Sequence, residues 1–182
     1  GGLAAIARKI EAQFDIKLNV ISGGNSSSIY LIWKEGLPEG INNLRLGESF
    51  LLGNDTAYGE TVPGCVHDTM TLEAQVIELK EKPSLPIGEV GVDAFGEKPY
   101  YEDRGMMKRA IIAVGKQDTD LGGMHPTDAQ IEIMGGSSDH TILDVTHADR
   151  GYKVGDVSSF TLECGAMLKL ATSPDVEKAY IK

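Results

Sequence analysis

The first sixty residues alternate between helical and strand-like hydrophobic patterns. Between Leu3 and Phe14 the apolar residues recur at intervals of three and four, which predicts an amphipathic helix. Residues 16–21 alternate and then become apolar, which predicts a strand, and the apolar stretch 29–33 predicts a second helix. A second strand is expected around 43–47. This order of helix, strand, helix and strand is typical of parallel α/β architecture.

The pattern changes after about residue 60. Period-two alternation and short apolar runs, separated by clusters of Gly, Pro, Asp and Ser, now follow one another at 70–76, 109–114, 131–134, 141–145 and, in part, 154–162. Such spacing is typical of an all-β domain. Six of the seven prolines lie from Pro63 onward. We therefore place a boundary within 58–66 and predict an α/β portion over 1–60, followed by a β domain over 61–182.

Composition and charge narrow the classes of function. The 182 residues include 17 basic and 27 acidic side chains, giving a net charge of −10, which disfavours nucleic acid and anionic membranes as partners. No run of about 18 apolar residues and no signal-peptide pattern is present, so a cytoplasmic protein is expected. The four histidines and the two cysteines, Cys65 and Cys164, have no metal-ligand spacing, and no metal site is expected.

A loop of glycines and hydroxyl side chains, Ser22-Gly23-Gly24-Asn25-Ser26-Ser27-Ser28, follows the first predicted strand. Sites in parallel α/β folds are built at the carboxyl ends of strands, where the N–H groups of the next helix attract anions. Hydroxyls and the Asn25 amide add donors for a phosphate. The alternative is an ordinary strand-to-helix loop with a serine N-cap.

The next strand ends in Arg45-Leu46-Gly47-Glu48-Ser49. If the two strands are neighbours, Arg45 and Gly47 face the same cleft as Ser26. An arginine there can donate to a ligand ring nitrogen or to an anion. The alternative is a rim arginine paired with Glu48 or Asp55.

Two loops of the β-rich part carry possible acid–base groups. Gly115-Lys116-Gln117-Asp118 follows one apolar run, and Gly135-Gly136-Ser137-Ser138-Asp139-His140 follows another. Such loops can supply acid–base groups or bind a cationic substrate. The alternative is turn chemistry, since Gly, Ser and Asp favour turns for backbone reasons.

In this order, the motifs are similar to those of a known family. The strand–SGGNSS–helix segment, the RLGES segment, Thr71-Leu72-Glu73-Ala74-Gln75-Val76 and the two later loops together resemble the alanine racemase superfamily of fold-type III pyridoxal-phosphate enzymes, and most of all its ornithine racemase-type branch. The resemblance implies the last βα units of a (β/α)8 barrel, which carries the cofactor, followed by a C-terminal β-barrel or sandwich domain.

The resemblance also implies roles for individual residues. Asn25 and Ser26 match the pair that binds the cofactor phosphate, Arg45 matches the arginine that contacts the pyridine nitrogen, and Gly47 and Glu48 match positions whose N–H groups hold the phosphate. An arginine at the ring nitrogen leaves this nitrogen mostly unprotonated. The ring is then a weaker electron sink, which favours racemisation over transamination.

This chain departs from the alanine-specific members at both β-domain loops. Lys116 stands where the alanine-specific members have a catalytic tyrosine. It is therefore a candidate for the second catalytic base, if its pKa is lowered near the cofactor. Asp118 is the other candidate for this base, or else a ligand of the substrate amino group. Ser138 and Asp139 stand in the stretch of their substrate-contacting Met-Asp motif. Extra carboxylates would suit a basic amino acid such as ornithine, through pairing with its side-chain ammonium.

A second departure concerns the cofactor lysine, which the family places in a Lys-Ala-(x)-x-Tyr-Gly context. No lysine from Lys9 to Lys182 has this context, and the chain begins at Gly1 without Met. We therefore expect a C-terminal fragment that is inactive alone. The family implies a head-to-tail homodimer in which the β-domain loops complete the other subunit's site. Alternative functions are a non-catalytic pyridoxal-phosphate carrier and a β-domain interaction module.

Overall fold

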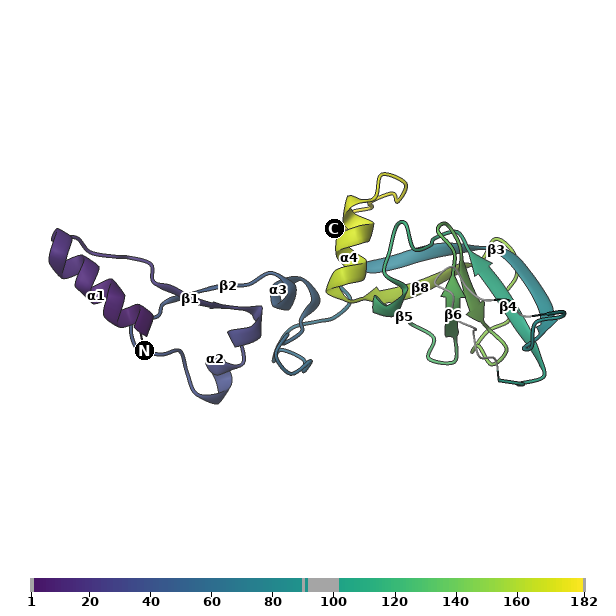
Figure 1. Ribbon diagram of the computed structural model, residues 1–182, viewed down its shortest axis with the longest axis horizontal. Coiled ribbons are helices and arrows are strands. Elements are labelled where there is room, and N and C mark those ends of the chain that lie inside the picture. The colour runs from purple at the N-terminus through teal and green to yellow at the C-terminus, as the bar shows by residue number, and fades with distance from the viewer. Residues whose placement is uncertain (1, 90, 92–101, 182) are drawn as a thin grey trace. The chain divides into compact units, whose positions relative to one another are not determined.

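The computed structural model describes residues 2–89, 91 and 102–181 and divides the chain into two compact units, Gly1–Met70 and Thr71–Lys182 (Figure 1). This division lies after the 58–66 segment in which the composition changes. Residues 61–69 bond back to the first unit: Val62 N donates to Gly53 O at 2.8 Å, and His67 Nδ1 lies 2.9 Å from Leu52 O. These bonds place the connecting segment with the first unit.

The first unit contains two short parallel strands and several helices. The helices are α1 (Gly2–Phe14), the 3-10 helix η1 (Ser26–Ser28), α2 (Leu31–Lys34) and α3 (Glu48–Leu52), and the strands are β1 (Ser22–Asn25) and β2 (Asn43–Arg45). The strands pair with Ser22 opposite Asn43 and Asn25 opposite Arg45. The parallel pairing confirms the α/β architecture expected from the sequence.

The position of the first strand was predicted wrongly. Residues 16–21 form no strand; instead β1 is the Ser22–Asn25 segment, which the sequence places in a turn. The glycines leave room for the neighbouring side chains, since a Cβ on Gly24 would lie 2.6 Å from Leu44 Cδ2. The apolar pattern upstream does not reflect burial in this unit, since Ile16 is 50% exposed and Val20 64%.

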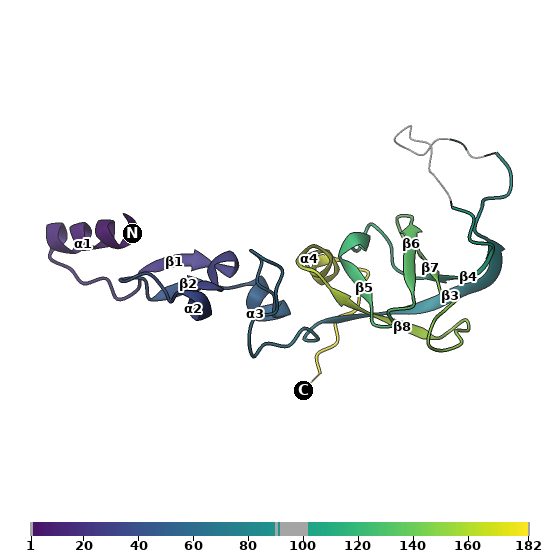
Figure 2. The same cartoon turned by 90° about the horizontal axis from the view of Figure 1, so that it is seen from below.

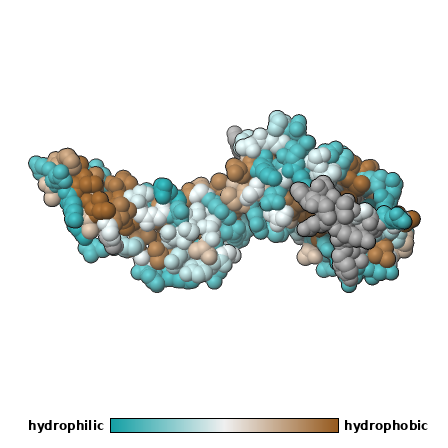
Figure 3. Space-filling model, viewed as in Figure 1, coloured by the Kyte–Doolittle hydropathy of each residue, from teal (hydrophilic) through white to brown (hydrophobic). Residues whose placement is uncertain are grey.

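Helix α1 exposes most of its apolar face. Ala4 and Ala7 are buried, but the larger apolar side chains of the helix lie at the surface: Leu3, Ile6, Ile10 and Phe14. Figure 3 shows the apolar surface gathered over this helix. The helix itself spans Gly2–Phe14, so the amphipathic pattern predicted its position correctly, although most of its apolar face is exposed in this unit.

The second unit is built on a six-stranded antiparallel sheet with the order β5-β8-β3-β4-β7-β6. Its strands are β3 (Thr71–Pro83), β4 (Met106–Ile112), β5 (Met124–Pro126), β6 (Glu132–Gly136), β7 (Thr141–Asp144) and β8 (Val157–Leu162). The 3-10 helix η2 (Leu121–Gly123) precedes β5. The long strand β3 pairs with β8 through its first half and with β4 through its second half, and the sheet curves into a nearly closed barrel (Figure 2).

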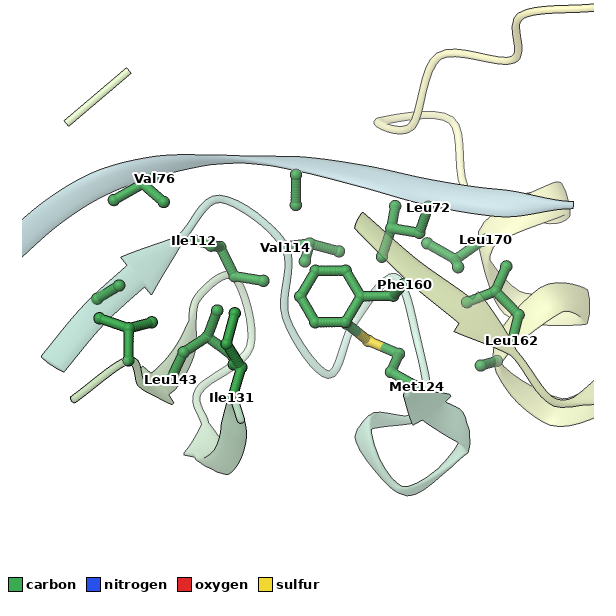
Figure 4. Packing of buried hydrophobic residues seen from close by; sticks show 14 residues of the cluster. Leu72, Val76, Ile112, Val114, Met124, Ile131, Leu143, Phe160, Leu162 and Leu170 are labelled. Atoms are coloured by element: carbon green, nitrogen blue, oxygen red, sulfur yellow. The ribbon is translucent and has the colours of Figure 1, made fainter. Parts of the chain in front are cut away.

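The core of this unit surrounds Phe160, which is fully buried on β8. Figure 4 shows the sulfur of Met124 beside its ring, with Val114 and Ile112 nearby. The inward positions of β3 are Leu72, Ala74 and Val76, which alternate with exposed residues as the period-two pattern predicts.

One helix of the second unit was not predicted. Helix α4 (Cys164–Thr172) follows β8 directly and buries Ala166 and Leu170 against the core. The spacing of four between these residues is helical, but the helix has only 9 residues. The unit therefore combines the expected β domain with one packed helix.

Candidate functional site

The predicted site residues lie in two groups, one in each unit. The phosphate cup consists of Asn25, Ser26, Arg45, Gly47 and Glu48 in the first unit. The loop pair consists of residues 115–119 and 136–140 in the second unit.

The parallel pairing of β1 and β2 assembles the phosphate cup. Because Asn25 lies opposite Arg45, the two strands end side by side, and the segments that follow them meet at one edge. Gly47 caps α3, and its N–H donates to the Ser26 hydroxyl at 3.2 Å. The expectation that the two motifs are neighbours is confirmed.

Ser26 is the centre of the cup. Its Oγ also accepts from the N–H of Ser49 at 3.3 Å, and the Ser49 hydroxyl donates to the Ser26 carbonyl at 3.4 Å. Ser26 is 8% exposed and Ser49 fully buried, so these bonds fix the turn between β2 and α3 against the glycine-rich loop. Sequence reasoning missed Ser49, although its place directly after the Arg-Leu-Gly-Glu segment was a usable signal.

The cup has space and a side-chain donor for a phosphate group. A Cβ built on Gly47 would meet no atom within 4 Å, so space is open on that side of the residue, while its N–H donates to Ser26 Oγ. Oδ1 of Asn25 accepts from both N and Oγ of Ser27, at 3.0 and 2.6 Å. This fixes the amide so that its NH2 group is turned away from Ser27 and is available as a donor. Arg45 is exposed and Glu48 is half-buried at the first turn of α3.

Backbone hydrogen bonds join the two loops of the loop pair. The N–H of Lys116 donates to Ser137 O at 2.9 Å, and the N–H of Gln117 donates to Ser138 O at 2.8 Å. Gly115 permits this approach, because a Cβ there would lie 2.4 Å from Ser138 O and 2.5 Å from Asp139 N. The structure thus brings together the Lys116 and Asp139 loops, which lie more than twenty residues apart in the sequence.

Asp139 is held as a carboxylate. Its Oδ1 accepts from the hydroxyls of Ser138 at 2.8 Å and Ser137 at 3.2 Å. These two hydrogen bonds, with the nearby His140 ring, lower the pKa of Asp139 below its usual value. Lys116 and Asp139 are both exposed, so the loop pair presents an amine and an ionised carboxylate to solvent.

Asp118 lies in a different environment from Lys116. It is 7% exposed, and its Oδ1 accepts from the hydroxyl of Ser173 at 2.7 Å. Ser173 is the C-cap of α4, so this bond ties the Lys116 loop to the end of the helix. The geometry favours a structural role for Asp118 over the base or substrate ligand that the sequence suggested. Sequence reasoning missed Ser173, whose position directly before Pro174 marks a helix end.

Replacing Ser173 by alanine is expected to destabilise the chain by about 1–3 kcal/mol, because a buried acceptor of Asp118 loses its donor. Urea unfolding of the S173A and D118A variants and of the double variant measures the coupling. We expect the double variant to be less destabilised than the sum of the single ones, by more than about 0.5 kcal/mol. Additive effects would show that this bond does not hold the loop.

The described residues include neither a metal-binding cluster nor a membrane-spanning helix. No group of three or more His, Cys, Asp or Glu side chains that could hold a metal occurs among the described residues. Within the same part of the chain, no helix is long and apolar enough to cross a membrane. In the first unit, Tyr30 and Tyr58 stack edge to face, with ring centroids 5.0 Å apart, and Lys34 Nζ lies 4.4 Å from the centroid of the Tyr58 ring.

The chain is similar to two curated racemases over nearly its whole length. Ornithine racemase of Acetoanaerobium sticklandii is 57% identical over 176 residues, which are 97% of this chain and 50% of that enzyme. Lysine racemase of Thermotoga maritima is 45% identical over 179 residues, which are 98% of this chain and 50% of that enzyme. The chain thus spans half the length of the curated relatives that it matches. No family model matches it.

Among solved structures, alanine racemase from Bartonella henselae, with covalently bound pyridoxal phosphate, is similar in fold. The match has a TM-score of 0.53 and 21% identity, and it covers 96% of this chain and 46% of that chain. This likeness confirms the fold class expected from the sequence. The chain is thus similar over nearly its whole length to half of an ornithine racemase and half of a lysine racemase, and it shares the fold of about half of an alanine racemase.

Proposed function

We propose that this chain is the C-terminal part of a pyridoxal-phosphate-dependent racemase that interconverts the L and D forms of a basic amino acid, ornithine or lysine. The observation that carries this proposal is the identity of 57% and 45% to an ornithine racemase and a lysine racemase over almost the entire chain. The second unit also supports an enzyme over a simple cofactor carrier, because barrel-only carriers lack such a β domain.

The phosphate cup is the proposed holding site of the cofactor. The hydroxyl of Ser26, which the N–H groups of Gly47 and Ser49 hold in place, and the NH2 of Asn25 would bind the phosphate, while Arg45 would contact the ring nitrogen. When bound, pyridoxal phosphate supplies an electron sink that makes the α-proton of the amino acid acidic. Arginine keeps its own proton at any relevant pH, so Arg45 would hold the ring nitrogen as an acceptor.

The loop pair supplies the proposed substrate groups. Lys116 would take or return a proton at the substrate α-carbon, which requires that its amine is neutral for part of the cycle. Asp139, whose pKa is lowered by the hydrogen bonds from its two serine donors, would pair with the side-chain ammonium of the basic amino acid. The backbone bonds between the two loops would fix the spacing of these two groups.

The assembly and location belong to the same proposal. A head-to-tail homodimer would let the loop pair of one subunit complete the cup of the other. The Schiff-base lysine would come from outside the motifs found in this chain, and the chain would be inactive alone. A cytoplasmic location stays a prediction.

The test is a chiral assay of the full-length enzyme with L-ornithine, L-lysine and L-alanine. We expect pyridoxal-phosphate-dependent formation of the D form, with kcat/KM highest for ornithine or lysine. A higher kcat/KM for alanine would overturn the substrate class, and activity without the cofactor would overturn the mechanism. The S26A variant should bind pyridoxal phosphate more weakly, as measured by its absorbance in equilibrium dialysis.

Replacing Asp139 by asparagine is expected to raise KM for ornithine by about 3- to 10-fold, because an exposed ion pair with the substrate ammonium is lost. Since the pKa of Asp139 is lowered, its carboxylate stays charged at neutral pH and above, and its contribution is lost only as the pH falls through that lowered pKa. The KM for ornithine, measured at neutral pH, should therefore separate D139N from the parent, while the KM for alanine should not change. An equal change for both substrates would contradict the assigned pairing.

A further inference from the structure

A cavity of about 370 Å³ lies in the second unit, between the sheet and the segment that follows β7. Its floor is apolar and includes Leu79, Val145 and Tyr152, all of which belong to the core or pack against it. Its walls are fixed by the backbone, since Lys108 N donates to Thr146 Oγ1 at 2.9 Å and Val145 N donates to Lys108 O at 2.9 Å. We call it the anion cavity.

The charged side chains at this cavity are mostly cations. Lys80, Lys108 and Arg150 line it, against the single carboxylate of Glu81. Lys80 is paired with Glu78 at 2.6 Å, but within the described ranges neither Lys108 nor Arg150 forms an ion pair. Residues 71–182 contain 19 acidic and 12 basic side chains, a net charge of −7. The cavity thus brings two cations, without an ion pair among the described residues, to one place in a unit whose net charge is negative.

Arg150 is held in place. Its guanidinium lies 4.6 Å from the centroid of the Tyr152 ring, and its Nη2 donates to the carbonyl of Val157. A guanidinium has five N–H donors, so most of them stay available for a ligand. A planar donor fork beside a second cation matches the oxygens of a phosphate group.

The anion cavity is separate from the loop pair. Lys108 lies near the start of β4, which ends at Ile112, and Gly115 follows shortly after the strand. At about 3.3 Å per residue of extended chain, Lys108 and Gly115 lie about 23 Å apart. Likewise β7 begins beside the loop at 136–140 and ends at Asp144, next to the cavity. The cavity and the loop pair thus lie at opposite ends of the same strands.

We propose that the anion cavity binds a small organic phosphate, with Lys108 and Arg150 on the phosphate and the organic part against Leu79, Val145 and Tyr152. This site goes beyond the racemase function and does not depend on it. The two cations favour a negatively charged ligand. The apolar floor favours a ligand with an organic part, which inorganic phosphate lacks.

The test is calorimetric titration of the full-length protein, loaded with pyridoxal phosphate and freed of excess, with phenyl phosphate and separately with inorganic phosphate. We expect K108Q and R150Q each to weaken phenyl phosphate binding by about 10-fold, while K153Q, an exposed lysine outside the cavity, leaves it unchanged. K108R should retain binding. Inorganic phosphate should bind more weakly than phenyl phosphate.

Two outcomes would overturn the proposal. One is absence of binding at millimolar phenyl phosphate, and the other is binding that K108Q and R150Q leave intact. Binding that S26A abolishes would place the ligand in the phosphate cup instead, which distinguishes this site from the proposed cofactor site. Equal affinity for both phosphates would contradict the apolar part of the site.

Discussion

A G115V variant is expected to lose about 3 kcal/mol of unfolding free energy and most of the racemase activity of the full-length enzyme. Any Cβ at this position would lie 2.4 Å from Ser138 O and 2.5 Å from Asp139 N, and both neighbours are backbone atoms that cannot rotate away. The loops must therefore separate, which breaks the bonds from Lys116 N and Gln117 N to the 137–138 carbonyls. Activity falls because Lys116 and Asp139 no longer keep their spacing.

The matched control is G122A. A Cβ on Gly122 would meet only Asp120 Oδ1, at 3.7 Å, which is an ordinary contact. This variant should unfold at the urea concentration of the parent or slightly above it, since alanine reduces the entropy of the unfolded chain. A G115V protein with the stability and kcat of the parent would show that the close approach of the two loops has no role in either.

The sequence was sufficient for those parts of the fold in which the period of the apolar residues matches the geometry of the element. The alternation in β3 and the spacing in α1 predicted their elements correctly, because each pattern follows directly from the geometry of the element. Strand β1 was misplaced because its sequence, Ser22-Gly23-Gly24-Asn25, has no row of apolar side chains. Helix α4 was missed because it is short and follows a strand without a break.

The candidate site was predictable where its residues lie at the ends of consecutive strands. Ser26, Gly47 and Arg45 follow two neighbouring parallel strands, so their proximity could be inferred from the order of elements alone. The partner of Asp118 could not be inferred, because Ser173 lies 55 residues away on an unpredicted helix. Lys116 and Asp118 are two positions apart and resemble each other as acid–base candidates in the sequence. Only the fold shows that one is exposed and the other buried.

Lys116 is the residue whose loss should affect catalysis most. In the full-length enzyme, K116M is expected to lower kcat for racemisation by about 10²- to 10⁴-fold, the usual contribution of a positioned general base. The stability should change little, because the side chain is exposed and only the backbone N–H of Lys116 takes part in the loop pair. K153M, which changes another exposed lysine of the same unit, is the matched control and should retain the parent kcat.

The effect of K116M on each enantiomer separately distinguishes a catalytic base from a positioning residue. Racemisation needs a proton acceptor on each face of the substrate α-carbon, so removal of one acceptor blocks abstraction from one enantiomer only. In deuterated solvent, K116M should still exchange the α-proton of one enantiomer of ornithine at close to the parent rate, while exchange of the other enantiomer is lost. K116Y, which restores the tyrosine that alanine-specific members carry at this position, should recover part of that exchange. If K116M slows exchange of both enantiomers equally, Lys116 positions the substrate and the second base lies elsewhere. In that case D139N should be measured next, because Asp139 is an exposed ionisable group of the same loop pair.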